Sequence, residues 1–318
     1  MIEIWEYKHK NVSLLQGKKI HSIRSPNRNL KYWVILNSPT HDDLAFVKEK
    51  FKLHPTTLED ISLSVTRTKY EEFDNYTLIV FKGIEEFKNG QIKTYTIHFI
   101  DGNNFLITVC HKNSDTINAL RTNKKKLGLL MKKGEDFVLH QIIDLEVDKF
   151  LDTRDKVIGR ISKIENIIKV PSKNELNSLF RSELIISKFK RVVESTLEVI
   201  ARLTKPTENY IDNTTIPYFR DVYDHLVRVD TSLMNVTDRI YSIRNVYLSI
   251  TSNHMNETIR MLTILMTVMM PLTIITGFFG MNVKLPGQDY MFMYVIVIVM
   301  MGIIGYILYL ILRFTKLV

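Results

Sequence analysis

Two long stretches without a charged residue set the main limit on what this chain can fold into. Residues 261–283 and residues 290–312 are each 23 residues long and contain no Asp, Glu, Lys or Arg. An α-helix rises about 1.5 Å per residue, so about 20 apolar residues cross the roughly 30 Å hydrocarbon layer of a bilayer. Because both stretches lie at the C-terminal end of a polar chain, they predict a membrane hairpin rather than two buried core helices.

The rest of the chain has the composition of a water-soluble domain. Of the 43 Lys and Arg and the 34 Asp and Glu, only four lie after residue 260, namely Lys284, Asp289, Arg313 and Lys316. The chain has one cysteine, Cys110. A single thiol excludes an intramolecular disulfide and a multi-thiolate zinc site.

The distribution of positive charge predicts how the hairpin is oriented. Two spans place both ends of the chain on the same side of the membrane. Arg244 and Arg260 precede the first span, Arg313 and Lys316 follow the second, and the loop at 284–289 carries no net charge. The positive-inside rule therefore predicts a multi-pass protein of the cell membrane with both termini in the cytoplasm.

The first part of the chain has the pattern of a mixed α/β domain. Alternating or β-branched runs predict strands at 76–81, 94–100 and 104–109, with turns at Asn89-Gly90 and Asp101-Gly102. Helices are expected to begin near Thr40 and Thr56, because an acid follows each threonine three positions later, as in a capping box.

Residues after about 135 are predicted to form long helices. No glycine lies between Gly159 and Gly277, and only three prolines interrupt the chain between them before Pro271. We expect one helix to about residue 169, a turn at 171–172, a second helix to about 204, and a third, continuous helix over 218–279.

The third helix carries a narrow apolar seam with alternating steps of four and three residues. Such a seam requires another helix against it. Packing on the preceding helices of the same chain and self-association both remain open. The seam consists of Val222, Leu226, Val229, Leu233, Val236, Ile240, Ile243, Tyr247 and Ile250.

The first predicted span also carries a row of neutral residues on one helical face, with alternating steps of three and four. This uncharged row consists of Asn256, Ile259, Thr263, Met266, Met270, Thr273 and Gly277. The absence of acids and bases excludes a proton relay or a charged selectivity ring in this span. The row suits a pore lined by several copies of the helix, or a small-residue face for close helix packing. One hairpin cannot enclose a pore, so a pore would imply a homo-oligomer around a rotation axis.

The end of the first span is similar to a known family. Its sequence, PLTIITGFFGMN over Pro271–Asn282, closes with Gly280-Met281-Asn282 after Phe279 and before a short loop and a final span. This resembles the CorA family of magnesium channels, which carries a G-M-N tripeptide at that place. The resemblance continues through His54-Pro55…Leu58-Glu59-Asp60, the stretch Tyr218–His225, and Ser252-Asn253…Asn256-Glu257.

The resemblance implies a homopentameric funnel. Each chain would contribute an α+β cytoplasmic domain, a long helical stalk and a two-helix C-terminal transmembrane hairpin. The expected parts are the α/β domain at 1–135, the stalk at 136–257, the pore-lining span at 258–282, the outer loop at 283–289, the second span at 290–313 and a cytoplasmic tail at 314–318.

The implied function is passive influx of hydrated Mg²⁺, with Co²⁺ and Ni²⁺ as possible substitutes. Gly280, Met281 and Asn282 would form the outer entrance, and the uncharged row would line the path inward. A zinc transporter of the same architecture and a membrane-anchored scaffold or sensor without transport are the alternatives.

The resemblance also implies regulation by Mg²⁺ bound between neighbouring subunits in the cytoplasm, which holds the channel closed. The matching residues are Glu59, Asp60 and Asp221. As an alternative, Glu59 and Asp60 would be capping-box acids for Thr56 or Thr57, and Asp221 would be a first-turn acid.

Other functional classes have no support in the sequence. We find no nucleophile–base motif, phosphate-binding loop or dinucleotide fingerprint, so we do not expect an enzyme. The basic run at 121–126 is interpreted as a solvated loop rather than a nucleic-acid contact.

Overall fold

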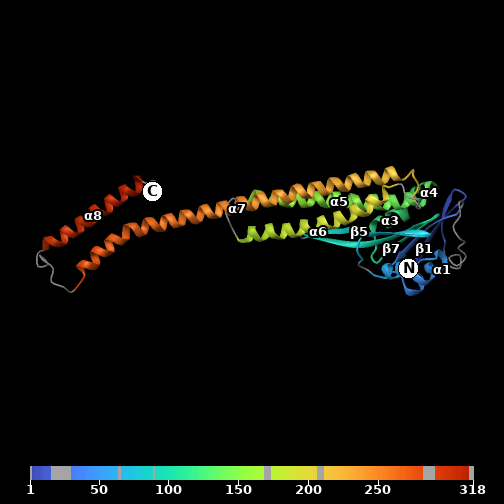
Figure 1. Cartoon of the computed structure of the whole chain (residues 1–318), viewed down its shortest axis with the longest axis horizontal. Coiled ribbons are helices and arrows are strands. Elements are labelled where there is room, and N and C mark those ends of the chain that lie inside the picture. The colour runs from blue at the N-terminus through green and yellow to red at the C-terminus, as the bar shows by residue number, and fades with distance from the viewer. Residues whose placement is uncertain are drawn as a thin grey trace. The chain divides into compact units, whose positions relative to one another are not determined.

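The computed structural model describes residues 2–15, 30–63, 66–88, 90–167, 173–205, 211–281 and 291–314 (Figure 1). The chain divides into two compact units, Met1–Ser242 and Ile243–Val318.

The first unit contains a seven-stranded sheet in the order β2-β1-β3-β7-β6-β5-β4. Only the pairing of β3 with β7 is parallel, and the other neighbours are antiparallel. The strands are β1 (Ile2–Lys8), β2 (Asn11–Leu15), β3 (Lys31–Asn37), β4 (Lys69–Phe73), β5 (Tyr76–Lys88), β6 (Gln91–Gly102) and β7 (Phe105–Cys110).

The three predicted strands correspond to β5, β6 and β7 and are confirmed. The turn predicted at Asp101-Gly102 is wrong, because both residues still pair within β6 and the chain reverses at 103–104. Gly90 has a φ of 74°, as the predicted turn requires, whereas Asn89 lies outside the described residues.

Two short helices pack on one face of the sheet. They are α1 (His41–Phe51) and α2 (Pro55–Ser62), and their buried residues join the apolar side chains of β3 and β5 in one core. The capping box predicted for α1 is confirmed, since Thr40 Oγ1 accepts from Asp43 N–H and Asp43 Oδ2 accepts from Thr40 N–H.

The cap predicted for α2 is wrong. The N-cap is His54, whose Nδ1 accepts from Thr56 N–H at 3.3 Å. The reason is Pro55, whose fixed φ and missing N–H suit the first helical position. The N-cap therefore lies two residues earlier in the chain than Thr56. Glu59 therefore does not close a capping box with Thr56, and this alternative explanation of the acid is removed.

The basic run at 121–126 lies largely in helices, which corrects the expectation of a loop. It covers the end of α3 (Asp115–Thr122) and the beginning of α4 (Lys124–Lys133), with Asn123 between them. Asn123 Oδ1 accepts from Lys126 N–H at 3.0 Å, so this side chain caps the second helix and allows it to begin within a run of lysines.

Three long helices follow, as the sequence predicts. They are α5 (Glu135–Ile167), α6 (Lys173–Leu203) and α7 (Ile216–Phe279), the last of them continuous through Pro271. The turn predicted at 171–172 lies outside the described residues.

The apolar seam of α7 is buried within the chain in the first unit. His140 and Phe219 pack with ring centroids 5.5 Å apart, and Arg239 forms an ion pair with Glu165, so α5 lies against α7. Packing within one chain therefore accounts for this part of the seam. The buried residues are Val222, Leu226, Val229, Leu233, Val236 and Ile240.

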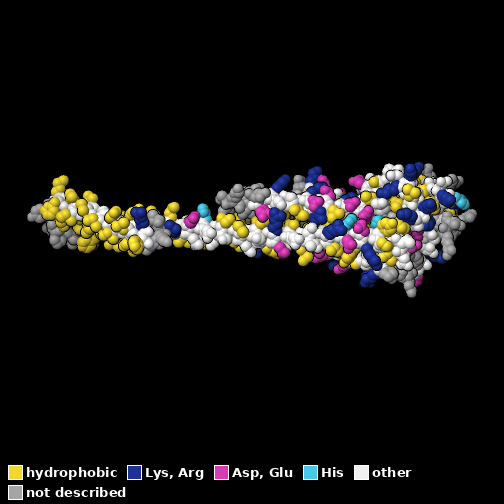
Figure 2. Space-filling view, turned by 90° about the horizontal axis from the view of Figure 1, so that it is seen from above, with side chains coloured by type: hydrophobic (Ala, Val, Ile, Leu, Met, Phe, Trp, Pro, Cys, Tyr) yellow, Lys and Arg dark blue, Asp and Glu magenta, His cyan; other side chains and the backbone are white. Residues whose placement is uncertain are grey.

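The second unit holds the later part of α7 and a final helix, α8 (Met291–Phe314). Both helices are long and apolar enough to cross a membrane. Figure 2 shows hydrophobic side chains gathered on this part of the chain, whereas charged side chains are spread over the first unit.

Candidate functional site: an uncharged helix face and an acidic pocket

The uncharged row of α7 lies on a face that the chain leaves uncovered. Ile259, Met266 and Met270 are 54%, 60% and 67% exposed. The other members of the row, Asn256, Thr263, Thr273 and Gly277, are exposed as well. Within one chain, therefore, the row is not used for packing.

A different face of the same span is partly shielded. At about 100° per residue, its half-buried positions are centred on the other side of the helix from the uncharged row, with Thr267 nearest to the row, and they are Ile264, Thr267, Val268, Pro271, Leu272 and Ile275. The shielded positions of α8 also form one stripe, made of Met293, Val297, Met301, Ile304, Gly305, Leu308 and Leu312. The uncharged row lies outside these shielded stripes and is therefore available to other copies of the chain.

The threonines of the row present oxygen lone pairs. Thr263 Oγ1 donates to Ile259 O at 2.8 Å, and Thr273 Oγ1 donates to Met269 O at 2.8 Å. Because each hydroxyl proton is used by the backbone, the oxygen faces its surroundings as an acceptor. The water molecules around a cation point their hydrogens outward, so acceptors are the groups that a hydrated cation can use.

The span ends in a tight turn at the glycine of the G-M-N tripeptide. Gly280 N–H donates to Thr276 O at 2.9 Å, and a Cβ added to Gly280 would lie 3.0 Å from the same oxygen. Glycine therefore suits this close approach of the backbone. Met281 is 54% exposed, and Asn282 lies outside the described residues.

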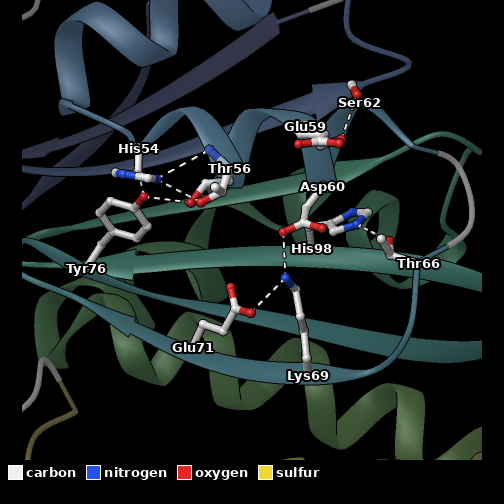
Figure 3. A network of polar contacts seen from close by, with 11 residues as sticks. His54, Thr56, Glu59, Asp60, Ser62, Thr66, Lys69, Glu71, Tyr76 and His98 are labelled. Atoms are coloured by element: carbon white, nitrogen blue, oxygen red, sulfur yellow. Dashed lines mark hydrogen bonds and ion pairs between the residues drawn. The ribbon is translucent and has the colours of Figure 1, made fainter.

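Glu59 and Asp60 lie on α2, which hydrogen bonds fix to the sheet. The buried Tyr76 hydroxyl of β5 accepts from His54 N–H at 2.9 Å and shares a 2.7 Å hydrogen bond with Thr57 Oγ1 (Figure 3). These contacts hold the first turn of α2 against β5. They fix the two acids on a short, well-anchored helix.

An acidic pocket of about 590 Å³ lies between α2 and β4. Its lining includes four carboxylates, Glu59, Asp60, Glu71 and Glu72, and one ammonium, Lys69. Lys69 Nζ lies 2.6 Å from Asp60 Oδ2 and 2.9 Å from Glu71 Oε1, so the ammonium joins the helix to the strand (Figure 3). With four acids and one base, the pocket attracts cations.

Two basic side chains at the acidic pocket, Lys69 and His98, keep one charge state near neutral pH. Burial lowers the pKa of Lys69, but its hydrogen bonds to Asp60 and Glu71 outweigh this effect and raise the pKa above the usual value. His98 lies beside Asp60 and shares a 2.7 Å hydrogen bond with Thr66 Oγ1. Burial, together with the nearby His111, lowers the pKa of His98 to about 4, so the ring is neutral at physiological pH.

Asp221 lies elsewhere, on an exposed face of α7. Its side chain is 68% exposed, and His225 Nε2 is 3.9 Å from Asp221 Oδ1. Because α7 begins at Ile216, Asp221 lies beyond the first turn, and the alternative explanation as a first-turn acid is wrong. Asp221 is not part of the acidic pocket of its own chain.

One chain does not bring the three predicted ligands together. Among the residues that the structure describes, no group of three or more His, Cys, Asp or Glu is arranged to hold a metal ion. The pair Glu59 and Asp60 could supply oxygen ligands, which suit Mg²⁺. A complete site built from them and Asp221 would need a second copy of the chain.

Three charged residues of the acidic pocket were not predicted from the sequence, namely Lys69, Glu71 and Glu72. Lys69 and Glu71 are two residues apart in a strand and therefore share a face. The alternation of charge in Lys-Tyr-Glu-Glu at 69–72 was the available signal. It does not reveal that α2 lies beside β4, and this neighbourhood creates the pocket.

The comparisons with known proteins agree over most of the chain. The family model described as CorA-like Mg²⁺ transporter protein matches residues 31–315. The cobalt/magnesium transport protein CorA of Thermotoga maritima is 31% identical over 266 residues, which cover 82% of this chain and 76% of that protein.

Solved structures show the same fold at lower identity. The complete CorA magnesium transporter of Methanocaldococcus jannaschii matches with a TM-score of 0.83 and 18% identity, covering 98% of this chain and 97% of that chain. The cytoplasmic domain of ZntB from Vibrio parahaemolyticus matches with a TM-score of 0.59 and 15% identity, covering 80% of this chain and 98% of that chain.

Proposed function

The chain belongs to the family of CorA-like Mg²⁺ transporter proteins, and from this premise we propose that it forms a channel through which hydrated Mg²⁺ flows passively into the cell. The observation that carries this proposal is the uncharged row of α7, which is exposed along its whole length within one chain. A helix that only anchored the protein would have no need of such a row.

The chemistry of the row suits a hydrated dication. Mg²⁺ is small, releases its water molecules reluctantly and prefers oxygen ligands. Neutral hydroxyl, amide and carbonyl oxygens accept hydrogen bonds from those waters without replacing them, and the weak binding permits release into the cell. Rings of Met270 and Ile259 would form apolar constrictions that close the path by dewetting.

The proposed channel is a homopentamer of the cell membrane with both termini in the cytoplasm. One hairpin cannot enclose a path, so several copies of α7 must surround a common axis. The resemblance to the family gives the number five, and the distribution of Lys and Arg gives the orientation. Gly280, Met281 and Asn282 would then stand at the outer entrance.

We also propose that cytoplasmic Mg²⁺ closes the channel by binding between neighbouring subunits. Glu59 and Asp60 of one copy would face Asp221 of the next, where bare carboxylates repel each other and a dication attracts both. Saturation of a site to ten times its Kd stabilises the bound form by about 1.4 kcal/mol. Several such sites per assembly would suffice to shift a closed–open equilibrium.

Flux into liposomes that contain the purified protein tests the proposed function. We expect Mg²⁺ to enter down its gradient without ATP, with Co²⁺ and Ni²⁺ as substitutes. Preferential Zn²⁺ flux would favour the alternative, a zinc transporter. The likeness to the ZntB domain is a likeness of fold and does not indicate which ion is transported. A correctly assembled protein without any flux would favour the anchored scaffold and refute the channel.

In the proposed regulation, Lys69 affects the internal Mg²⁺ concentration at which the channel closes. Its ammonium neutralises Asp60, so a dication that binds Asp60 must first displace it. Replacing Lys69 with Met should lower the internal Mg²⁺ concentration that half-inhibits flux by about fivefold, since a partly exposed ion pair contributes on the order of 1 kcal/mol. Half-inhibition is measured in liposomes with Mg²⁺ varied on the cytoplasmic side.

A matched control is Lys112→Met, which removes the ion pair of Lys112 Nζ with Glu85 Oε2 at 2.9 Å, outside the acidic pocket. It should leave the half-inhibiting concentration unchanged. Asp221→Lys should raise it, because a proposed ligand becomes a cation. If Lys69→Met closes at the same Mg²⁺ concentration as the unmodified protein, or a higher one, Asp60 is not a regulatory ligand.

A further inference from the structure

A basic cavity lies beside the turn between β5 and β6, where α5 and α6 pass the sheet. It has a volume of about 450 Å³, and three cationic side chains, Arg160, Arg181 and Lys188, contribute to its lining. No Asp or Glu is among the lining residues that the structure describes. The volume is in the range of small-molecule sites, roughly 300–1,000 Å³. The cavity shares no lining residue with the acidic pocket.

The three cations are not neutralised by the described part of the chain. No ion pair with an acid joins Arg160, Arg181 or Lys188 among the described residues. The Nε atom of Arg160 is buried, and no described residue forms a hydrogen bond with it. A buried donor of a charged group without a partner is costly. With no acid paired to them in the described part of the chain, the three positive charges can attract an anionic ligand into the cavity.

The adjacent turn is built to let the guanidinium of Arg160 come close. Gly90 has a φ of 74°, and a Cβ added there would lie 2.8 Å from Arg160 Nη1. A residue with a Cβ would be strained by this backbone conformation, and it would require the guanidinium to move away. Glycine at this turn therefore permits Arg160 to lie against the hairpin, at the edge of the cavity.

One face of α6 supplies the rest of the cavity in a regular pattern. Arg181, Leu184, Ile185 and Lys188 follow each other at steps of three, one and three residues, so they share one side of the helix. The two cations are about 10 Å apart along the axis, at about 1.5 Å per residue. Leu184 lies between them in the sequence and is 63% exposed, and Ile92 adds apolar surface from β6.

We propose that this basic cavity binds a nucleoside polyphosphate. Arg160, Arg181 and Lys188 hold the phosphates, and the cations of α6 are far enough apart to engage more than one phosphate group. The base packs on the apolar surface of Ile92 and Leu184, since Ile185 is only 9% exposed. An exposed leucine between two cations fits a ligand with both an anionic and an apolar part better than it fits inorganic phosphate.

Binding of ATP to the full-length protein in detergent, measured by calorimetry at physiological ionic strength, tests the proposal. EDTA is included, so that no divalent cation can link ATP to the carboxylates of the protein. We expect ATP to bind and adenosine not to bind. Arg181→Glu with Lys188→Glu should weaken ATP binding by at least about tenfold, because two charge-assisted contacts are reversed.

The matched control is Arg202→Glu, which reverses an exposed cation of the same helix outside the cavity. It should bind ATP as the unmodified protein does. Thermal unfolding shows whether each variant is folded, and both substituted positions of the double variant are exposed. Absence of ATP binding by the unmodified protein, or equal losses in Arg202→Glu and Arg181→Glu/Lys188→Glu, would overturn the site. Equal affinity for tripolyphosphate and ATP would overturn the assignment to a nucleotide.

Discussion

Replacing Asn282 with alanine should abolish Mg²⁺ uptake in a cell that lacks its own Mg²⁺ transport, while the protein still reaches the membrane and assembles. In the proposed pore, five copies of this amide meet the ion at the entrance and hold its waters. Each hydrogen bond to a charged partner contributes about 1.5–3 kcal/mol. Loss of the ring should therefore reduce uptake on the order of a hundredfold or more.

A purely structural role for Asn282 is the competing explanation, because asparagine is a common helix C-cap. The structure weakens it, since α7 ends at Phe279 and Gly280 makes the closing hydrogen bond to Thr276 O. Asn282 stands two positions beyond that glycine in the sequence. A capping role would also predict lost assembly rather than lost transport.

The matched control is Asn253→Ala, which removes an exposed amide of α7 on a different side of the helix from the uncharged row. It should transport Mg²⁺ as the unmodified protein does. Uptake is followed with radioactive or fluorescent reporters of the ion, and assembly by size-exclusion chromatography. Normal uptake by Asn282→Ala would remove this residue from the selectivity role.

The features that could be predicted from the sequence are those that depend on near neighbours along the chain. The limits of α6 and α7 are within two residues of the expectation, because charge, glycine and proline mark them directly. The capping box of Thr40 and Asp43 is equally local. The uncharged row follows from helical spacing alone, and its role in lining a path stays a prediction.

The features that were missed depend on which elements lie side by side. The helix begins near Thr56 as expected, but its N-cap was misplaced, because the cap is His54, which precedes Pro55 and is further held by Tyr76 of β5. Lys69 and Glu71 become part of a cation-attracting pocket only because β4 lies beside α2. Likewise, the periodicity of α7 predicts the apolar seam but not its partner. That the seam is buried within one chain follows only from the position of α5 in the structure.

A cysteine at Thr273 should make the channel sensitive to a charged thiol reagent, and this experiment tests the uncharged row directly. The chain is suited to it, because its only cysteine is Cys110. Cys110 is 1% exposed, and burial raises the pKa of its thiol, so it should not react. The reagent is a cationic methanethiosulfonate, which adds a fixed positive charge to an accessible cysteine.

In the proposed pore, five added charges face a passing dication at short range. Two unit charges 4 Å apart repel by about 1 kcal/mol in bulk water and by about 4 kcal/mol at an effective dielectric constant of 20. Flux through modified Thr273→Cys should therefore fall by more than tenfold. Met261→Cys is the matched control, since Met261 is 74% exposed but lies on the side of the helix opposite the uncharged row. Its modification should leave flux nearly unchanged. Equal inhibition of the two variants would mean that the uncharged row does not line the path of the ion. The same conclusion would follow if Thr273→Cys were labelled and its flux were not inhibited.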